Sequence, residues 1–283
     1  MRVTILEPGA GLPDHQLPPY ADMLHAYHLS REAELRALVA QLPIAPGDRV
    51  LDVASGDACF SCWLAERGAT VAGIDRSSAY LDLAKRNVAG SALAERIGFQ
   101  QADARALPFP DGSFDLVWCA QSLFSLPDPL EVLREMVRVA RPGGTVAVLE
   151  NDSLHHMIIP WPAELELAVR QAQLRALEQR NHGPLHKFYI GRDLCGLFAQ
   201  SGIDDCDVQT VAVERHAPLE PAEQQFLRGH FGQLRRLIAR QLDPATLQAF
   251  DLLFDPDSEL DLLCRPDFHL THLEMLALGR KPA

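Results

Sequence analysis

Lysine is scarce in this sequence: only Lys85, Lys187 and Lys281 occur among 283 residues. Lysine and arginine together number 26 against 38 aspartate and glutamate residues, which gives a formal net charge of −12. Proteins that bind the phosphate backbone of nucleic acids normally present an excess of basic side chains. The composition therefore predicts no nucleic-acid partner and favours a small, neutral or cationic substrate.

Long apolar runs are also lacking. No stretch reaches the roughly eighteen consecutive apolar residues that indicate a transmembrane helix. The first residues contain no basic segment followed by an apolar one, so they do not resemble a secretory signal peptide. We therefore expect a protein that has no membrane partner and is cytoplasmic.

Cysteine is sparse, with six residues scattered along the chain. Only Cys59 and Cys62 have the C-x-x-C spacing of a redox or metal-binding pair. No second pair lies at a metal-ligand spacing, and both thiols fall on nearly one face of an expected helix. We interpret them as small buried core residues and predict no metal site.

Residues 50–60 combine a strand, a turn of small residues and the start of a helix. Val50–Val53 is apolar and β-branched at both ends, which is typical of a short buried strand. Small or turn-forming residues follow from Ala54 to Ala58, and apolar residues then recur at helical spacing from Cys59 to Arg67. Such a unit binds nucleotide-type ligands at the carboxyl edge of a parallel sheet.

Strand and helix patterns alternate over the first half of the chain. Strands are expected at 50–53, 70–74, 97–102, 114–119 and 145–149, with helices at 59–67, 77–88 and 129–139 between them. This rhythm predicts an α/β fold with a doubly wound, mostly parallel, Rossmann-like sheet. Two further strands, 208–213 and 268–278, would pair as a long-range hairpin, giving seven strands with an antiparallel last strand and helical caps.

We expect one domain with distinct segments. They are N-terminal lid helices at 1–46, a ligand-binding core at 47–150, a helical cap at 151–190 and 216–267, and the end of the core sheet at 191–215 and 268–283.

Two acids indicate where an adenosine would bind. Asp75 ends the second strand, 19 residues after Gly56, at the place where an acid accepts both ribose hydroxyls. Asp103 ends the third strand and can accept the adenine amino group, while the backbone N–H of Ala104 reaches a ring nitrogen.

A dinucleotide is the main competing ligand. The G-x-G-x-x-G turn that holds a pyrophosphate needs three glycines, whereas here two glycine positions are Ala54 and Ala58. Asp52 and Asp57 also place two carboxylates around the turn, which would repel a diphosphate and attract an ammonium group. Adenosine joined to a zwitterionic sulfonium tail satisfies these features, and that ligand is S-adenosylmethionine.

Residues 47–150 resemble a class I S-adenosylmethionine-dependent methyltransferase of the small-molecule, methyltransferase type 11-like group. Residues 50–58 are similar to the first motif of that family, acid-x-Gly-x-Gly-x-Gly. Family-like segments also occur at 106–115, 126–129 and 141–144. The resemblance implies S-adenosyl-L-methionine as cofactor, S-adenosyl-L-homocysteine as product and no metal. The residues expected to bind the cofactor are Tyr20, Asp52, Ala54, Ser55, Gly56, Asp75, Arg76, Asp103, Ala104 and Gln121.

The catalytic residues are less clearly indicated, because Phe124 stands where many relatives carry a histidine. Methyl transfer needs a base only when the acceptor is protonated, as a hydroxyl is. His155 and His156, just after the last parallel strand, are the candidates for that base.

Apolar residues of the caps favour an apolar acceptor of the lipid, polyketide, quinone or other secondary-metabolite kind, with O- or C-methylation ahead of N-methylation. Two alternatives stay open: a non-methylating reaction such as cyclisation or rearrangement, and a binding module without turnover. A homodimer is one option for the assembly.

Overall fold

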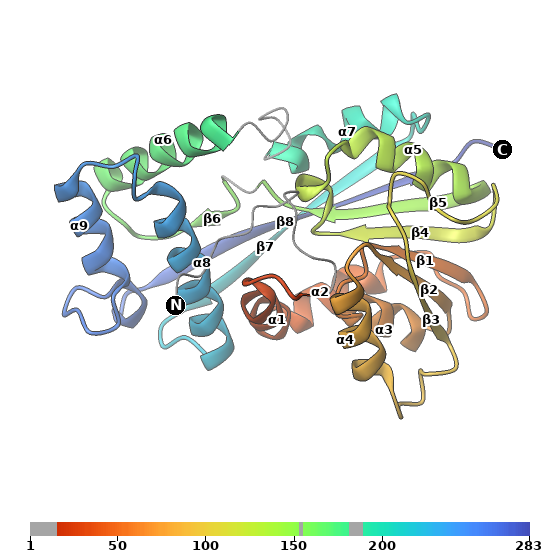
Figure 1. Cartoon of the computed structure of the whole chain (residues 1–283), viewed down its shortest axis with the longest axis horizontal. Helices are drawn as coiled ribbons and strands as arrows, with labels where there is room; N and C mark the ends of the chain where they lie inside the picture. Colours follow the sequence, from red (N-terminus) through yellow and green to blue (C-terminus); the bar gives the residue numbers. More distant parts are fainter. Residues whose placement is uncertain (1–15, 153–154, 181–188) are drawn as a thin grey trace.

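The centre of the molecule is one eight-stranded sheet with the strand order β3-β2-β1-β4-β5-β8, and both β6 and β7 pair with β8 (Figure 1). The computed structural model describes residues 16–152, 155–180 and 189–283, so parts of the expected lid and cap lie outside the described residues. The strands are β1 (Arg49–Val53), β2 (Thr70–Asp75), β3 (Ile97–Gln101), β4 (Phe114–Ala120), β5 (Ala140–Glu150), β6 (Met157–Ile158), β7 (Cys206–His216) and β8 (His269–Arg280).

The first five strands are parallel and β8 is antiparallel to β5, as the sequence predicts. Side chains alternate between the two faces of the sheet, so each inner strand contributes to two cores. On β4, Leu116 and Trp118 belong to one hydrophobic cluster, whereas Val117 and Cys119 belong to the other. This is why the inner strands read as continuous apolar runs in the sequence.

Helices cover both faces. They are α1 (Ala21–Ser30), α2 (Glu32–Ala40), α3 (Cys59–Glu66), α4 (Ser78–Val88), α5 (Pro129–Val139), α6 (Ala163–Arg180), α7 (Ile190–Gln200), α8 (Pro221–Ile238) and α9 (Pro244–Phe254), with short 3₁₀ turns at Leu123–Ser125 and Leu262–Cys264. Apolar side chains of α2 and α3 join the cluster of Trp118, and those of α5 and α7 join the cluster of Val117. The side chain of Ser77 caps α4 by accepting the N–H of Tyr80.

The cap helices α6, α8 and α9 gather at one end of the molecule, on the left in Figure 1, while β1, β2 and β3 lie at the other end. Strands β7 and β8 pair along their whole lengths and connect the two ends, which confirms the predicted long-range hairpin. Strand β6 has only two residues, too few to carry a sequence pattern, and makes eight strands where seven were predicted. In the described ranges, no helix is both long and apolar enough to cross a membrane.

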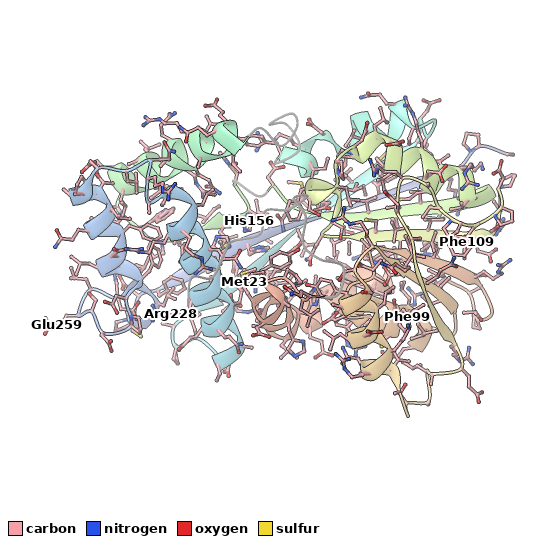
Figure 2. The ribbon with its side chains drawn as sticks, in the orientation of Figure 1. Met23, Phe99, Phe109, His156, Arg228 and Glu259 are labelled. Atoms are coloured by element: carbon pink, nitrogen blue, oxygen red, sulfur yellow. The ribbon has the colours of Figure 1, made fainter. Side chains whose placement is uncertain are left out.

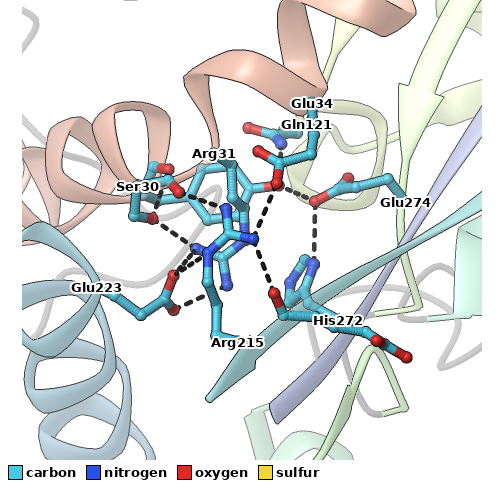
Figure 3. Close-up of polar contacts among 10 residues, drawn as sticks. Ser30, Arg31, Glu34, Gln121, Arg215, Glu223, His272 and Glu274 are labelled. Carbon is cyan, nitrogen blue, oxygen red and sulfur yellow. Dashed lines mark hydrogen bonds and ion pairs between the residues drawn. The ribbon is translucent and has the colours of Figure 1, made fainter. Parts of the chain in front are cut away.

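A buried ion pair fastens the N-terminal helices to the cap (Figure 3). The Arg31 guanidinium, 0% exposed, donates to both carboxylate oxygens of Glu223 on α8, at 3.0 and 3.2 Å. It also lies over the rings of Tyr27 and Phe226, 4.8 and 4.5 Å from their centroids. Breaking a buried pair strands an uncompensated charge, so this contact fixes the position of α1 relative to α8.

The order of the strands in the sheet changes direction between β1 and β4, which lie side by side. From β1 the sheet continues to β2 and β3 on one side, and from β4 it continues to β5 on the other. Loops diverge at such a switch point and leave a crevice at the carboxyl ends of the strands.

Candidate active site

A cavity of about 450 Å³ opens at this switch point, between the core sheet, α1 and the cap helix α8. Figure 2 shows His156 and Met23, which both line it, in the middle of the molecule in this view. They lie between core residues such as Phe99 and cap residues such as Arg228. One end of the cavity is formed by the strand-end residues of the core, and the other by the lid and the cap.

The turn after β1 keeps the backbone shape of a glycine turn although two of its glycine positions are alanine. Ala54, Gly56 and Ala58 have φ angles of +58°, +53° and +70°, in the left-handed region that glycine prefers. The Ser55 N–H donates to the carbonyl of Ile74 at 2.9 Å and holds the turn against β2. Ala54 and Gly56 line the cavity, so the backbone itself is exposed to a ligand.

Asp75 lies at the end of β2 with its carboxylate in this turn. It accepts the N–H of Gly56 at 3.0 Å and that of Ser77 at 2.8 Å, and it lines the cavity. Burial raises the pKa of the Asp75 carboxyl, while these N–H donors act in the opposite direction. The carboxylate is therefore held rigidly, with further lone pairs available to a ligand.

Asp103 and Ala104 extend the same edge of the sheet. The Asp103 carboxylate pairs with Arg105 at 2.7 Å, and hydrogen bonding from that side chain lowers the pKa of Asp103. Arg76 and Arg105 also line this end of the cavity.

Two tyrosines complete the cofactor end. Tyr20, directly before α1, lines the cavity, and burial raises its pKa, with the charge of Asp75 adding to the effect. Tyr80 on α4 was not predicted, yet it lines the cavity too. Its hydroxyl is buried and has no hydrogen-bond partner among the described residues. A buried hydroxyl without a partner, on a residue that lines a cavity, is a group that a polar ligand would satisfy.

Asp52 and Ser55, both predicted to bind the cofactor, are not among the residues that line the cavity. Asp52 is buried and accepts the hydroxyl of Ser61 on α3 at 2.5 Å. Burial raises the pKa of Asp52 to about 7, and the charges of Asp75 and Asp57 add to the shift. The Asp52 side chain points toward α3, so Asp52 supports the turn from inside the fold.

Gln121, which lines the cavity, joins the core to the N-terminal helix (Figure 3). Its backbone φ is +51°, and its side-chain amide donates to the Tyr27 hydroxyl at 2.5 Å. The Tyr27 hydroxyl in turn donates to the Glu274 carboxylate on β8. His272 Nδ1 lies 3.1 Å from the same carboxylate. A series of hydrogen bonds from Gln121 through Tyr27 to Glu274 therefore links the core, α1 and β8.

The far end of the cavity mixes apolar and uncharged polar side chains. They are Met23, Leu24, Tyr27, Phe124, Leu126, Asn151, His156, Phe226, His230, Gln233 and His272. Burial lowers the pKa values of His156, His230 and His272 well below 6.5, so all three imidazoles are neutral at neutral pH.

His156 is the better placed of the two predicted bases. Its Nδ1 lies 3.1 Å from the Asp152 carbonyl oxygen, which can only accept, so Nδ1 carries the proton and Nε2 has a free lone pair. Its own carbonyl accepts the N–H of Leu273 on β8 at 2.8 Å. His155 is more exposed, lies beside the ring of Tyr189 and is not among the cavity-lining residues.

His230 and His272 were missed by sequence reasoning, although a signal exists for each. His230 follows Phe226 by one helical turn on α8, on the face that packs inward. His272 and Glu274 alternate with Leu270 and Leu276 on the buried face of β8. Polar groups on a buried face are the informative exception to the usual burial pattern.

Glu150, at the end of β5, accepts the N–H groups of Ser122 and Leu123 at 2.7 and 2.6 Å. Burial raises its pKa from 4.5 to about 8. Between these two values the folded chain keeps a proton that the unfolded chain loses, so the free energy of unfolding falls as the pH rises. In Glu150→Gln the charge is gone and an acceptor oxygen remains.

We expect Glu150→Gln to be more stable than the native chain at pH about 8.5, by on the order of 1–3 kcal/mol, and to lose less stability with rising pH. Urea unfolding of both proteins at about pH 6 and pH 8.5 measures this. A variant that is less stable than the native chain at the higher pH would show that Glu150 is charged and needed as such.

Comparison with known proteins agrees with this geometry. Residues 51–148 match the methyltransferase domain family. Methyltransferase GfsG of Streptomyces halstedii is 41% identical over 114 residues, which cover 40% of this chain and 41% of that protein. The 27-O-demethylrifamycin SV methyltransferase of Amycolatopsis mediterranei is 36% identical over 130 residues, 46% of each chain. The matches thus span less than half the length of these curated relatives.

Phosphoethanolamine N-methyltransferase 2 of Haemonchus contortus, solved with S-adenosyl-L-methionine, has the same fold. Its TM-score is 0.57 at 18% identity, covering 97% of this chain and 61% of that one.

The strand order, the turn after β1 and the acid after β2 define a Rossmann-like nucleotide-binding core. Residues 51–148, which span most of this core, match the methyltransferase domain family, and the features of the core are those of a class I S-adenosylmethionine-dependent methyltransferase. S-Adenosylmethionine is the cofactor of this family, and the orphaned Tyr80 hydroxyl and the fixed Asp75 carboxylate fit it. When bound, it supplies an electrophilic methyl carbon on a positively charged sulfur.

Proposed function

We propose that this protein methylates an oxygen, or an acidic carbon, of a small, uncharged and largely apolar acceptor. In this proposal Tyr20, Ala54, Gly56, Asp75, Arg76, Asp103, Ala104 and Gln121 bind the cofactor, and His156 is the general base. Asp52 and Ser55 act on the cofactor indirectly, by supporting the turn. The lid at 1–46 and the caps at 151–190 and 216–267 enclose the acceptor.

The distribution of charge along the cavity is the observation that carries the proposal. Every charged side chain among the described lining residues, namely Asp75, Arg76, Asp103 and Arg105, belongs to the cofactor end. The lid and cap contribute apolar side chains, neutral histidines and amides. A cationic amine or a phosphorylated acceptor would lose its hydration there without gaining an opposite charge, which is costly.

His156 supplies the proton acceptor that a hydroxyl requires. Nε2 takes the proton of the acceptor hydroxyl, while the Nδ1 proton stays on the Asp152 carbonyl and fixes the ring. Bound S-adenosylmethionine would supply the methyl group to the acceptor oxygen and would leave as uncharged S-adenosylhomocysteine. The rest of catalysis is positioning, which the Tyr27–Glu274 and Arg31–Glu223 contacts secure by fixing α1 over the cavity.

The Amycolatopsis relative supports methylation at oxygen, because its name gives 27-O-demethylrifamycin SV as its acceptor. The match covers only 46% of each chain, so the acceptor of this protein is inferred from the cavity and not from that relative.

Release of S-adenosylhomocysteine in the presence of an acceptor panel tests the proposal. The panel pairs neutral hydroxyl-bearing aromatic and aliphatic compounds with their amine and phosphate analogues. We expect turnover with the neutral members alone. Turnover confined to amines or phosphates would refute the proposal, and conversion of an acceptor without S-adenosylhomocysteine release would indicate non-methylating chemistry.

A further inference from the structure

Two histidines face each other across the end of the β7–β8 ladder, outside the cavity lining. His216 on β7 pairs in register with His269 on β8, and their rings stack with centroids 4.8 Å apart and an interplanar angle of 24°. In the next pair the Ala217 N–H donates to the Phe268 carbonyl at 3.0 Å. The histidines therefore occupy a non-hydrogen-bonded position, where opposite side chains of an antiparallel pair come closest.

Glu214 adds a third donor on the same face of the sheet. It precedes His216 by two residues on β7, and its partner on β8 is Thr271, two residues after His269. One carboxylate oxygen of Glu214 and one ring nitrogen from each histidine all lie within 4.8 Å of one another. Within the described ranges, no cationic side chain lies at ion-pair distance from Glu214, since Arg215 turns to Glu34 and Glu223 instead.

We propose that Glu214, His216 and His269 form a binding site for a divalent transition metal, Zn²⁺ in particular. Two imidazoles and one carboxylate are a donor set that suits zinc, whereas Mg²⁺ and Ca²⁺ prefer oxygen ligands. Zinc bonds of about 2.0–2.2 Å place tetrahedral ligands roughly 3.3 Å apart, so the three donors must converge by at most about 1.5 Å. Glu214 and His216 are exposed, and their side chains are free to make this movement.

The site has a structural role in the fold. His216 and His269 are the last pair of the long β7–β8 ladder, and α8 begins at Pro221, a few residues beyond His216. Helix α8 carries Phe226 and His230 of the cavity and Glu223 of the buried ion pair. A metal bridging the strand ends would hold the base of this helix and bind only the folded chain, so it would raise the unfolding temperature.

Titration of the tag-free, chelator-treated full chain with ZnCl₂ in a calorimeter at pH 7.5 tests the site. We expect one equivalent to bind, with affinity reduced at least about tenfold in His216→Ala and in His269→Ala, and by a smaller factor in Glu214→Gln. His25→Ala, which removes a histidine whose Nδ1 lies 3.8 Å from the Asp57 carboxylate, is the matched control and should bind as the native chain does.

Absence of binding would overturn the proposal. So would equal binding by the native chain and the His216→Ala/His269→Ala double variant, which would assign the metal to other groups such as the exposed thiols of Cys195 and Cys264. Circular dichroism of each variant verifies that it is folded. None of these outcomes depends on the methyltransferase activity.

Discussion

Replacement of His156 by alanine is expected to lower kcat for a hydroxyl acceptor by about 10²–10⁴-fold, the usual contribution of a general base. The affinity for S-adenosylmethionine should stay close to that of the native enzyme, because His156 lies at the acceptor end of the cavity. Single-turnover kinetics and calorimetry separate the two quantities. The matched control is His155→Ala, which changes the neighbouring residue outside the cavity lining and should retain activity.

The same residue predicts an unusual pH dependence. Burial, with the neighbouring His272 as the next cause, lowers the pKa of His156 well below 6.5. The base is therefore already unprotonated at pH 6, where a solvent-exposed histidine would be mostly charged, and kcat should decline only in more acidic solution. If His155→Ala abolished turnover while His156→Ala did not, the assignment of the base would be reversed.

Replacement of Asp75 by alanine is expected to weaken S-adenosylmethionine binding by about 10–150-fold, because the ligand loses its hydrogen bonds to a charged carboxylate. The variant also leaves the N–H groups of Gly56 and Ser77 without their acceptor, which loosens the turn. Asp75→Asn keeps one acceptor oxygen and should therefore have an intermediate affinity.

Asp82→Asn is the control for the Asp75 variants, because Asp82 is an exposed acid of α4 outside the cavity lining. Calorimetric titration with S-adenosylhomocysteine gives the affinities without turnover. Native-like binding by Asp75→Ala would mean that the adenosine binds elsewhere.

The cofactor core was predictable because its signals are local. The strand, turn and helix of 50–67 follow each other directly, and a fixed spacing links Gly56 to Asp75. The structure confirms the parallel order of these strands. It also places the Asp75 carboxylate where it accepts the N–H of Gly56. The alanines at positions 54 and 58 do not disrupt the turn, because both adopt the left-handed backbone conformation that glycine would have there.

The acceptor end could not be predicted in the same way, because its residues come from distant parts of the chain. His156 directly precedes β6, whereas His230 lies on α8 and His272 on β8, and their rings meet through the pairing of β6 with β8 and the packing of α8. The metal site has the same origin, since β7–β8 register alone brings His216 to His269. Sequence spacing carries no record of such contacts.

The inward orientation of Asp52 was missed for a related reason. Its place in the motif suggests contact with the cofactor, but strand alternation directs the side chain to Ser61. A motif gives the order of residues along the chain, whereas the pleat of the strand decides which of them reach the ligand.

A crystal structure with S-adenosylhomocysteine tests the central claim most directly. The account predicts ribose hydroxyls on the Asp75 carboxylate, adenine beside Asp103 and Ala104, and the sulfur facing the end of the cavity that holds His156. An adenosine outside this edge of the sheet, or a sulfur directed away from His156, would contradict it.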